Sequence, residues 1–223
     1  DAGACGARAA MIGGGGGTTN VLAGKMFDIP VKGTHAHSWI MSFKTELEAF
    51  RTYARLYPDN CLLLVDTYDT LKSGVPHAIQ VFDELKASGI HPKMYGIRLD
   101  SGDLAYLTKK ARKMLDAAGH TDAVISASSD LDEYVIESLQ RQGAKITSWG
   151  VGTNMITAAD CPAFGGVYKL AAITDEEGNF IPKIKVSENV EKVTNPGNKT
   201  VFRLYDSENG KIKADLIALA DEV

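Results

Sequence analysis

The sequence predicts an α/β protein in which parallel strands alternate with helices, followed by a β-rich carboxy-terminal segment. Between residues 28 and 175, short apolar runs alternate with amphipathic stretches at intervals of about thirty residues, with no hairpin turn between successive runs. After about residue 175, turn-forming clusters separate short β-like runs. Strand–helix units of the first kind give parallel strands joined by right-handed crossovers. They fit both an α/β barrel and a doubly wound sheet.

The expected strands are apolar runs that end at turn or polar residues. They cover residues 29–37, 61–65, 94–99, 123–127, 146–151 and 166–173. The expected helices are amphipathic and lie between strands. They cover residues 45–56, 77–87, 104–118 and 130–142. Thr45 and Glu48 form a capping box at the first helix, Asp130 with Glu133 starts the last, and glycines at 89, 119 and 143 end the later three.

The pattern divides the chain into three parts. Residues 1–17 are mostly Ala and Gly. Such a stretch can be a glycine-rich phosphate loop, but no Gly-Lys-Ser/Thr follows it as in a P-loop, so we expect it to be flexible. Residues 18–175 are expected to form the α/β portion with the active-site mouth, and residues 176–223 a β-rich appendage or barrel return. The Ala/Gly-rich start without a methionine leads us to expect a fragment of a longer protein.

Composition excludes several classes of protein. The net charge is −4, so no overall positive field would attract nucleic acid, and we expect no nucleic-acid partner. Cys5, Cys61 and Cys161 are far apart, odd in number and lack metal-ligand spacing, as expected for reduced thiols in the cytoplasm. We expect no membrane partner, because no apolar run approaches the length of a membrane span.

Polar residues and glycines follow the carboxyl ends of five expected strands. They are His35 and His37; Asp66 and Asp69; Arg98 and Asp100; Ser128, Ser129 and Asp130; and Gly150, Gly152 and Thr153. In parallel α/β folds these strand ends converge on one mouth, where active sites lie. The sequence therefore predicts a ligand site built from these five segments.

The segment 96–103 is the strongest part of this prediction. Arg98 can hold a phosphate with two parallel hydrogen bonds, and Asp100 and Asp103 can accept sugar hydroxyls or the water of a bound Mg²⁺. Ser101 and Gly102 open the next helix with free N–H groups. A simple N-cap is the alternative interpretation, since Asp, Ser and Gly are common where a strand meets a helix. A cap accounts for one of these residues but not for Arg98 and Asp100 together.

Two other segments allow more than one interpretation. His35 and His37 alternate, so in a strand both would face the same side with metal-ligand spacing, which raises a metal-dependent hydrolase as a rival. That rival needs histidines at later strand ends, and the other three lie at a helix start or on the opposite loops. Packed, hydrogen-bonded histidines remain an alternative. In 149–154, two glycines after a strand expose backbone N–H groups that can cradle phosphate.

Six segments together resemble the nicotinate phosphoribosyltransferase family. They are 17–24, 33–38, 65–70, 96–104, 150–153 and 165–170, in this order. The resemblance implies an irregular α/β barrel of the type II phosphoribosyltransferase kind. It also implies a reaction of nicotinate with phosphoribosyl pyrophosphate that yields nicotinate mononucleotide and pyrophosphate in NAD salvage. ATP would be the co-substrate, and Mg²⁺ would bridge the pyrophosphate and carboxylates.

The resemblance also implies residue roles. His37 matches the histidine that is transiently phosphorylated by ATP, and Arg98 and Asp100 match the pair along the ribose and base. The remaining substrate-binding positions, at the ribose and the phosphates, are Ser128, Ser129, Gly150, Gly152, Thr153 and Lys169. Ser129 stands where the family would have asparagine, which departs from the pattern at a ribose contact.

The resemblance leaves base specificity open. An amino-terminal part expected to help bind the pyridine ring and pyrophosphate lies outside this sequence, and a full-length homodimer is expected. The alternatives are a phosphoribosyltransferase that uses nicotinamide or quinolinate, and a non-catalytic barrel that binds a nucleotide or sugar phosphate.

Overall fold

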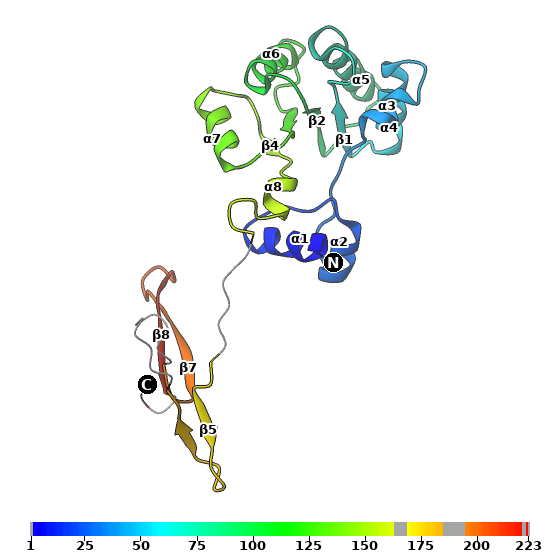
Figure 1. Cartoon of the computed structure of the whole chain (residues 1–223). Coiled ribbons are helices and arrows are strands. Elements are labelled where there is room, and N and C mark those ends of the chain that lie inside the picture. The colour runs from blue at the N-terminus through cyan, green and yellow to red at the C-terminus, as the bar shows by residue number, and fades with distance from the viewer. Residues whose placement is uncertain (1, 163–168, 185–194, 220–221, 223) are drawn as a thin grey trace. The chain divides into compact units, whose positions relative to one another are not determined.

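The computed structural model describes residues 2–162, 169–184, 195–219 and 222. The chain divides into two compact units, Asp1–Ala163 and Phe164–Val223 (Figure 1). This corrects the boundary expected near residue 175. The reason is β5 (Ala172–Thr174), which overlaps the last expected parallel strand but pairs antiparallel with β6 (Phe180–Pro182) in the second unit.

The first unit is built on a four-stranded parallel sheet. Its strands are β1 (Asn60–Leu64), β2 (Met94–Leu99), β3 (Val124–Ala127) and β4 (Ser148–Trp149). They lie in the order β1-β2-β3-β4, and every neighbouring pair is parallel. A doubly wound sheet reverses its strand order at a switch point, whereas these strands follow the chain without reversal. The winding is therefore that of a barrel, and the four strands form an open part of one.

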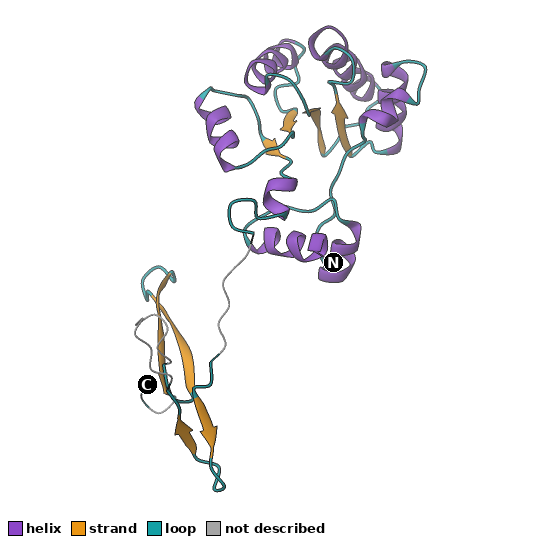
Figure 2. Cartoon of the chain, in the orientation of Figure 1, coloured by secondary structure: helices purple, strands orange, loops and turns teal. Residues whose placement is uncertain are grey.

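Four helices cover one face of this sheet. They are α4 (Glu46–Leu56), α5 (Val75–Ala87), α6 (Leu104–Ala117) and α7 (Glu133–Arg141), arranged around the outside of the strands (Figures 1 and 2). All four were expected from the sequence, as were the four strands.

No helix in the described ranges is long and apolar enough to cross a membrane.

Each of the helices α4 to α7 begins or ends at a residue whose side chain or backbone conformation caps it. The Thr45 hydroxyl oxygen accepts the Glu48 backbone N–H at 3.2 Å, which confirms the predicted cap of α4. Gly89, at φ 73°, follows α5 in the left-handed conformation that glycine adopts without strain, and 119 and 143 behave alike. Asp132, rather than the expected Asp130, caps α7 by accepting the Val135 N–H.

The core lies between the sheet and these helices. Leu63, Ile97 and Ile125 point from three adjacent strands into a cluster that includes Val81 of α5 and Leu115 of α6. All five are at most 1% exposed. Burying one such side chain is worth about 1.5–3 kcal/mol, so this layer holds the strand ends in place.

The amino-terminal Ala/Gly segment is helical, which corrects the expectation of a flexible stretch. It forms α1 (Ala2–Ile12), which contacts α2 (Val21–Phe27) and the short α8 (Thr153–Ile156). Alanine has the highest helix propensity, and the small Gly6 allows Ile156 to approach closely.

The expected strand at 29–37 is also corrected. Val31 makes only an isolated parallel bridge with Thr18, and His37 begins α3 (His37–Met41). Pro30 has no N–H to donate to a strand ladder, which limits pairing here.

A single π-helical turn, η1 (Thr70–Gly74), connects the end of β1 to α5. It brings Gly74 against the end of β1, where a Cβ atom on Gly74 would lie 1.8 Å from the carbonyl oxygen of Val65. Single π turns are frequent at functional sites. The turn η1 begins where the loop that follows β1 ends.

Gly74→Ala is expected to lower the free energy of unfolding by about 3 kcal/mol, because the added methyl must displace the Val65 backbone. Urea unfolding of this variant and of Gly33→Ala provides a matched pair. A Cβ on Gly33 meets nothing within 4 Å, so that substitution should change stability by less than about 1 kcal/mol. Equal effects of the two substitutions would contradict the packing at Gly74.

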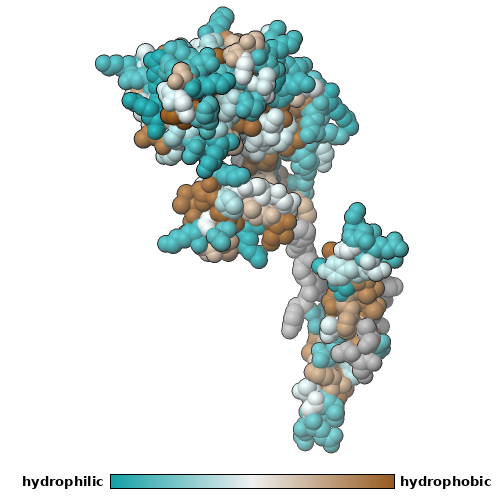
Figure 3. All heavy atoms as spheres, turned by 180° about the vertical axis from the view of Figure 1, so that it is seen from behind, coloured by the Kyte–Doolittle hydropathy of each residue, from teal (hydrophilic) through white to brown (hydrophobic). Residues whose placement is uncertain are grey.

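The second unit consists of two antiparallel strand pairs. β5 pairs with β6, and β7 (Lys199–Tyr205) pairs with β8 (Ile212–Leu219). This confirms the β-rich carboxy-terminal segment, although residues 166–168 of the expected last strand lie outside the described residues. Apolar side chains are exposed on the long hairpin, among them Val201 and Ile217. Figure 3 shows brown, hydrophobic surface on this unit.

Candidate functional site

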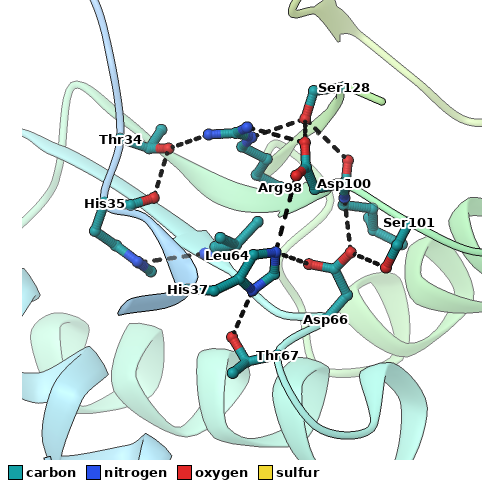
Figure 4. Close-up of polar contacts among 11 residues, drawn as sticks. Thr34, His35, His37, Leu64, Asp66, Thr67, Arg98, Asp100, Ser101 and Ser128 are labelled. Atoms are coloured by element: carbon teal, nitrogen blue, oxygen red, sulfur yellow. Dashed lines mark hydrogen bonds and ion pairs between the residues drawn. The ribbon is translucent and has the colours of Figure 1, made fainter. Parts of the chain in front are cut away.

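The site lies where the four parallel strands end. Asp66, Asp100, Ser128 and Gly150 follow β1, β2, β3 and β4 in turn. The strand register places these ends side by side, because Leu99 pairs with Ala127, which in turn pairs with Trp149. Figure 4 shows the polar side chains at the first three ends pointing toward one another. The predicted convergence on one mouth is thus confirmed for these strands.

Arg98 lies at the centre of this cluster. Its Nε donates to Ser128 Oγ at 2.9 Å, its Nη1 to Thr34 Oγ1 at 2.8 Å and its Nη2 to Asp100 Oδ1 at 3.0 Å (Figure 4). A guanidinium has five N–H donors, so two remain for a ligand. With its side chain 27% exposed, Arg98 is both fixed and accessible.

Asp100 is held as a carboxylate. Burial alone would raise its pKa, but hydrogen bonds from the Ser128 hydroxyl and from Arg98, with the charges of Arg98 and His37, outweigh burial and keep the pKa below its usual value. Its Oδ1 is occupied by these two donors, whereas Oδ2 faces His37. The arrangement presents one negative oxygen to the mouth.

The low pKa of Asp100 predicts a pH-dependent stability. Because its pKa is lower in the folded protein than in the unfolded chain, ionised Asp100 stabilises the fold above the unfolded-state pKa, and this contribution is lost as the pH falls through the folded-state pKa. The unfolding free energies of the wild type and Asp100→Asn should therefore differ most near neutral pH and converge in acid. Urea titrations between about pH 3 and 7 check this, and a pH-independent difference would contradict it.

His37 lies beside two carboxylates. Its Nδ1 is 2.9 Å from Thr67 Oγ1, and its Nε2 is 3.9 Å from Asp66 Oδ1 and 3.8 Å from Asp100 Oδ2 (Figure 4). The His37 side chain is 37% exposed. One nitrogen is thus oriented by a hydroxyl, while the other faces negative charge at an accessible surface.

Asp66 joins the ends of β1 and β2. Its side chain is 2% exposed, and its Oδ2 accepts the Asp100 backbone N–H at 2.8 Å and the Ser101 hydroxyl at 2.6 Å. Its Oδ1 is buried and has no hydrogen-bond donor among the described residues. A buried carboxylate oxygen without a donor is costly, so Asp66 has spare capacity to accept a proton donor or a cation.

His35 and His37 do not share one face, which corrects the strand interpretation. His35 is buried, 7% exposed, and its ring lies edge-on to Tyr53 with centroids 4.6 Å apart. The interpretation of a packed, hydrogen-bonded histidine therefore holds for His35, whereas His37 is hydrogen-bonded but 37% exposed. The two diverge because the segment leaves the extended conformation when α3 begins at His37.

The glycine segment after β4 lies beside this cluster at one end. The Gly150 N–H donates to the Ala127 carbonyl at 2.8 Å, and a Cβ on Gly150 would lie 3.3 Å from that of Ser128. Gly152 and Thr153 are exposed at the start of α8. Phosphate binding by these three residues stays a prediction.

The other predicted ligand residues have mixed outcomes. Ser129 is exposed at φ 103°, a conformation that costs a non-glycine residue energy. Lys169 belongs to the second unit, and its role also stays a prediction. Asp103 accepts the Tyr106 N–H at 2.9 Å as the cap of α6, so the N-cap interpretation holds for Asp103. Asp69 likewise caps η1.

Two hydroxyl residues, Thr34 and Thr67, were missed as site residues, and they orient Arg98 and His37. The positions of these two threonines gave a usable signal, since Thr67 directly follows a strand-end aspartate and Thr34 precedes the two histidines. Ser101 was expected to contribute its backbone N–H, and in the structure its hydroxyl donates to Asp66 Oδ2.

No group of three or more His, Cys, Asp or Glu side chains in the described ranges is placed to hold a metal ion. Two carboxylate oxygens nevertheless converge near His37, Asp66 Oδ1 and Asp100 Oδ2. This set fits Mg²⁺, which keeps several waters and binds through one or two carboxylates together with substrate phosphates.

Solved structures share this fold. A crystal structure of human nicotinic acid phosphoribosyltransferase superimposes with a TM-score of 0.74 and 26% identity, over 99% of this chain and 50% of that chain. A nicotinate-nucleotide pyrophosphorylase from Pyrococcus furiosus has a TM-score of 0.62 at 24% identity, over 96% of this chain and 49% of that chain. These matches agree with an α/β fold of the type II phosphoribosyltransferase kind with a β-rich segment.

Sequence comparison gives the family. Nicotinate phosphoribosyltransferase of Bacillus subtilis is 57% identical over 222 residues, 100% of this chain and 44% of the Bacillus protein. The human protein of that name is 30% identical over 264 residues, 95% of this chain and 48% of its own length. The chain thus spans less than half the length of these relatives. The nicotinate phosphoribosyltransferase (NAPRTase) family model matches residues 15–199, and the chain belongs to this family.

Proposed function

We propose that the full-length protein transfers phosphoribose from phosphoribosyl pyrophosphate to nicotinate, with ATP hydrolysis, to give nicotinate mononucleotide and pyrophosphate. The observation that carries this proposal is the set of hydrogen bonds at the strand ends, where Arg98, Asp100 and Ser128 lie beside an accessible histidine. Family membership supports it, because the relatives bear the name of this reaction.

The mouth suits a sugar phosphate with a charged base. The two unused N–H groups of Arg98 can hold a carboxylate or phosphate oxygen, which fits the nicotinate carboxylate or the ribose phosphate. The backbone of Gly150, Gly152 and Thr153 would hold the ribose 5′-phosphate. The Gly150 N–H is already bonded to the Ala127 carbonyl, so the N–H groups of Gly152 and Thr153 would be the donors in this segment.

In the transfer step, the pyridine nitrogen forms a bond to ribose C1′ while the bond from C1′ to the pyrophosphate oxygen breaks with its electron pair. Positive charge develops on the ribose as this oxygen leaves. Asp100 is ionised at neutral pH and presents Oδ2 to the mouth, so it can stabilise that charge electrostatically. Arg98 and Ser128 hold Asp100 in position and keep it from turning away.

His37 would couple the reaction to ATP. With a proton on Nδ1 donated to Thr67 Oγ1, the lone pair of Nε2 is free to attack the γ-phosphorus, the bond to the ADP oxygen breaks and ADP leaves. Asp66 and Asp100 face this nitrogen and can balance the positive charge of the phosphorylated imidazole. Water later cleaves the phosphorus–nitrogen bond and releases phosphate.

Mg²⁺ belongs to this proposal as the cofactor, with Asp66 and Asp100 as the residues that would hold it. When bound, it supplies charge neutralisation for the phosphate groups. We also propose a cytoplasmic homodimer of the full-length protein that binds neither nucleic acid nor membrane, in keeping with the net charge of −4.

The test measures pyrophosphate release from phosphoribosyl pyrophosphate by the full-length protein. Nicotinate, nicotinamide and quinolinate are supplied separately, each with and without ATP and Mg²⁺. We expect release with nicotinate, faster when ATP is present. No release with nicotinate, or faster release with another base, would overturn the proposed substrate.

A further inference from the structure

The segment before His37 is held to the sheet by one side chain. Residues 33–36 have no regular secondary structure, and β1 is an edge strand of the four-stranded sheet. Successive backbone N–H groups of a strand point to opposite sides. Val65 N donates to Arg98 O in β2, so the N–H of the preceding residue, Leu64, points away from β2 toward the open edge. His35 Nε2 lies 3.3 Å from the Leu64 nitrogen and accepts the hydrogen bond of its N–H (Figure 4). The imidazole thus occupies the place of a carbonyl on a neighbouring strand.

This bond requires an uncharged ring. Nε2 can accept only while it carries no proton, so the proton of neutral His35 sits on Nδ1, which is buried. Burial is the main cause that lowers the pKa of His35 to about 4, partly opposed by the Ala36 backbone and reinforced by the charges of Arg98 and His37. The acceptor therefore persists through neutral and mildly acidic pH.

The bond connects the two chain segments that form the histidine site. Leu64 ends β1, two residues before Asp66 and three before Thr67, which contact His37. His35 lies two residues before His37 on the other segment. Tyr53 and Phe50 pack against the His35 ring and restrict its orientation. A shift of this ring would move His37 relative to its partners on the strand.

We propose that His35 is a positioning residue, a neutral imidazole that accepts the Leu64 N–H and so holds His37 Nε2 in front of Asp66 and Asp100. The anchor, meaning the hydrogen bond from the Leu64 N–H to His35 Nε2, does not depend on the proposed function, whereas its consequence for phosphoryl transfer does. A misplacement of a reacting group by about 1 Å can lower a rate about a hundredfold. Loss of the anchor should therefore lower the rate of His37 phosphorylation.

Nitrogen-15 NMR of the full-length protein tests the anchor without any substrate. We expect the wild-type His35 ring to carry its proton on Nδ1 and a bare Nε2 from about pH 5 to 8, following its lowered pKa. A proton on Nε2 anywhere in this range would overturn the proposal, because the ring could not then accept the Leu64 N–H. This readout needs no variant and is independent of enzyme activity.

The kinetic arm compares His35→Gln with His35→Leu. Glutamine retains an acceptor with similar reach, whereas leucine has none. We expect His35→Leu to slow labelling of His37 by γ-labelled ATP by about tenfold or more, with an unchanged KM for phosphoribosyl pyrophosphate, and His35→Gln to restore the rate to within about threefold. The exposed His91→Leu is the control.

Wild-type labelling by folded His35→Leu would overturn the proposal, as would His35→Gln labelling as slowly as His35→Leu. Absence of labelling in the wild type would instead contradict the ATP-coupled function. The NMR measurement would then still decide whether His35 is the anchor.

Discussion

Replacing Asp100 with Asn is expected to lower kcat of the full-length protein by about a hundredfold or more, the size typical of removing one electrostatic stabiliser. The substitution preserves shape and removes the charge that Arg98 and Ser128 hold in place. Steady-state pyrophosphate release measures it. The loss should appear mainly in kcat, because the charge on the ribose develops in the transition state.

Asp103→Asn is the matched control in the same loop. Asp103 caps α6 through the Tyr106 N–H, and asparagine caps helices about as well as aspartate, so both kcat and stability should stay near the wild type. Wild-type kcat in Asp100→Asn would contradict the role of Asp100. An equal loss in Asp103→Asn would point to a general effect of charge in this loop.

His37→Ala is expected to abolish the phosphoenzyme. Incubation of the full-length wild type with γ-labelled ATP should give an adduct that is labile in acid and stable in base, as phosphohistidine is. The variant should carry no such label, because the accessible nitrogen beside Asp66 and Asp100 is gone. It should retain slow transfer that ATP does not accelerate, because Arg98, Asp100 and Ser128 remain.

His91→Ala serves as the control, because His91 is exposed in the loop between α5 and β2. It should label like the wild type. Label that persists in His37→Ala would contradict the assignment and move the acceptor to another residue. His35 would be a poor substitute, because its Nε2 already accepts the Leu64 N–H.

The elements whose pattern is local could be predicted from sequence. Amphipathic spacing of apolar residues and caps identified α4 to α7, and the short apolar runs between them identified β1 to β4. Thr45 and Gly89 illustrate why this works, since each satisfies or ends a helix through atoms within a few residues. Barrel winding needed the structure, because strand order is a property of packing between distant segments.

The failures share a cause in tertiary context. Residues 29–37 have the composition of a strand, but the edge of β1 is occupied by the His35 side chain instead of a strand backbone. The Ala/Gly segment became α1 because α2 and α8 pack against it, which composition alone does not reveal. The last expected strand contributed to an antiparallel pair, since its periodicity does not specify its partner.

Site residues were predicted where a polar side chain lies at a strand end. The threonine hydroxyls that orient Arg98 and His37 were missed. Arg98, Asp100 and Ser128 were found because a charged or polar residue lies at the end of an apolar run or directly after it. Thr34 contacts Arg98 from 64 positions earlier in the chain, so no local pattern could pair them. The caps at Asp69 and Asp103 look the same in sequence as Asp66 and Asp100, and only their hydrogen bonds distinguish them.

The central claim is that the carboxyl ends of β1 to β4 form the nucleotide site. A crystal structure of the full-length protein with bound nicotinate mononucleotide tests it most directly. The account predicts the ribose beside Arg98 and Asp100 and the phosphate against the backbone of Gly150, Gly152 and Thr153. A nucleotide bound at the opposite ends of these strands, or with no contact to Arg98 and Asp100, would contradict it.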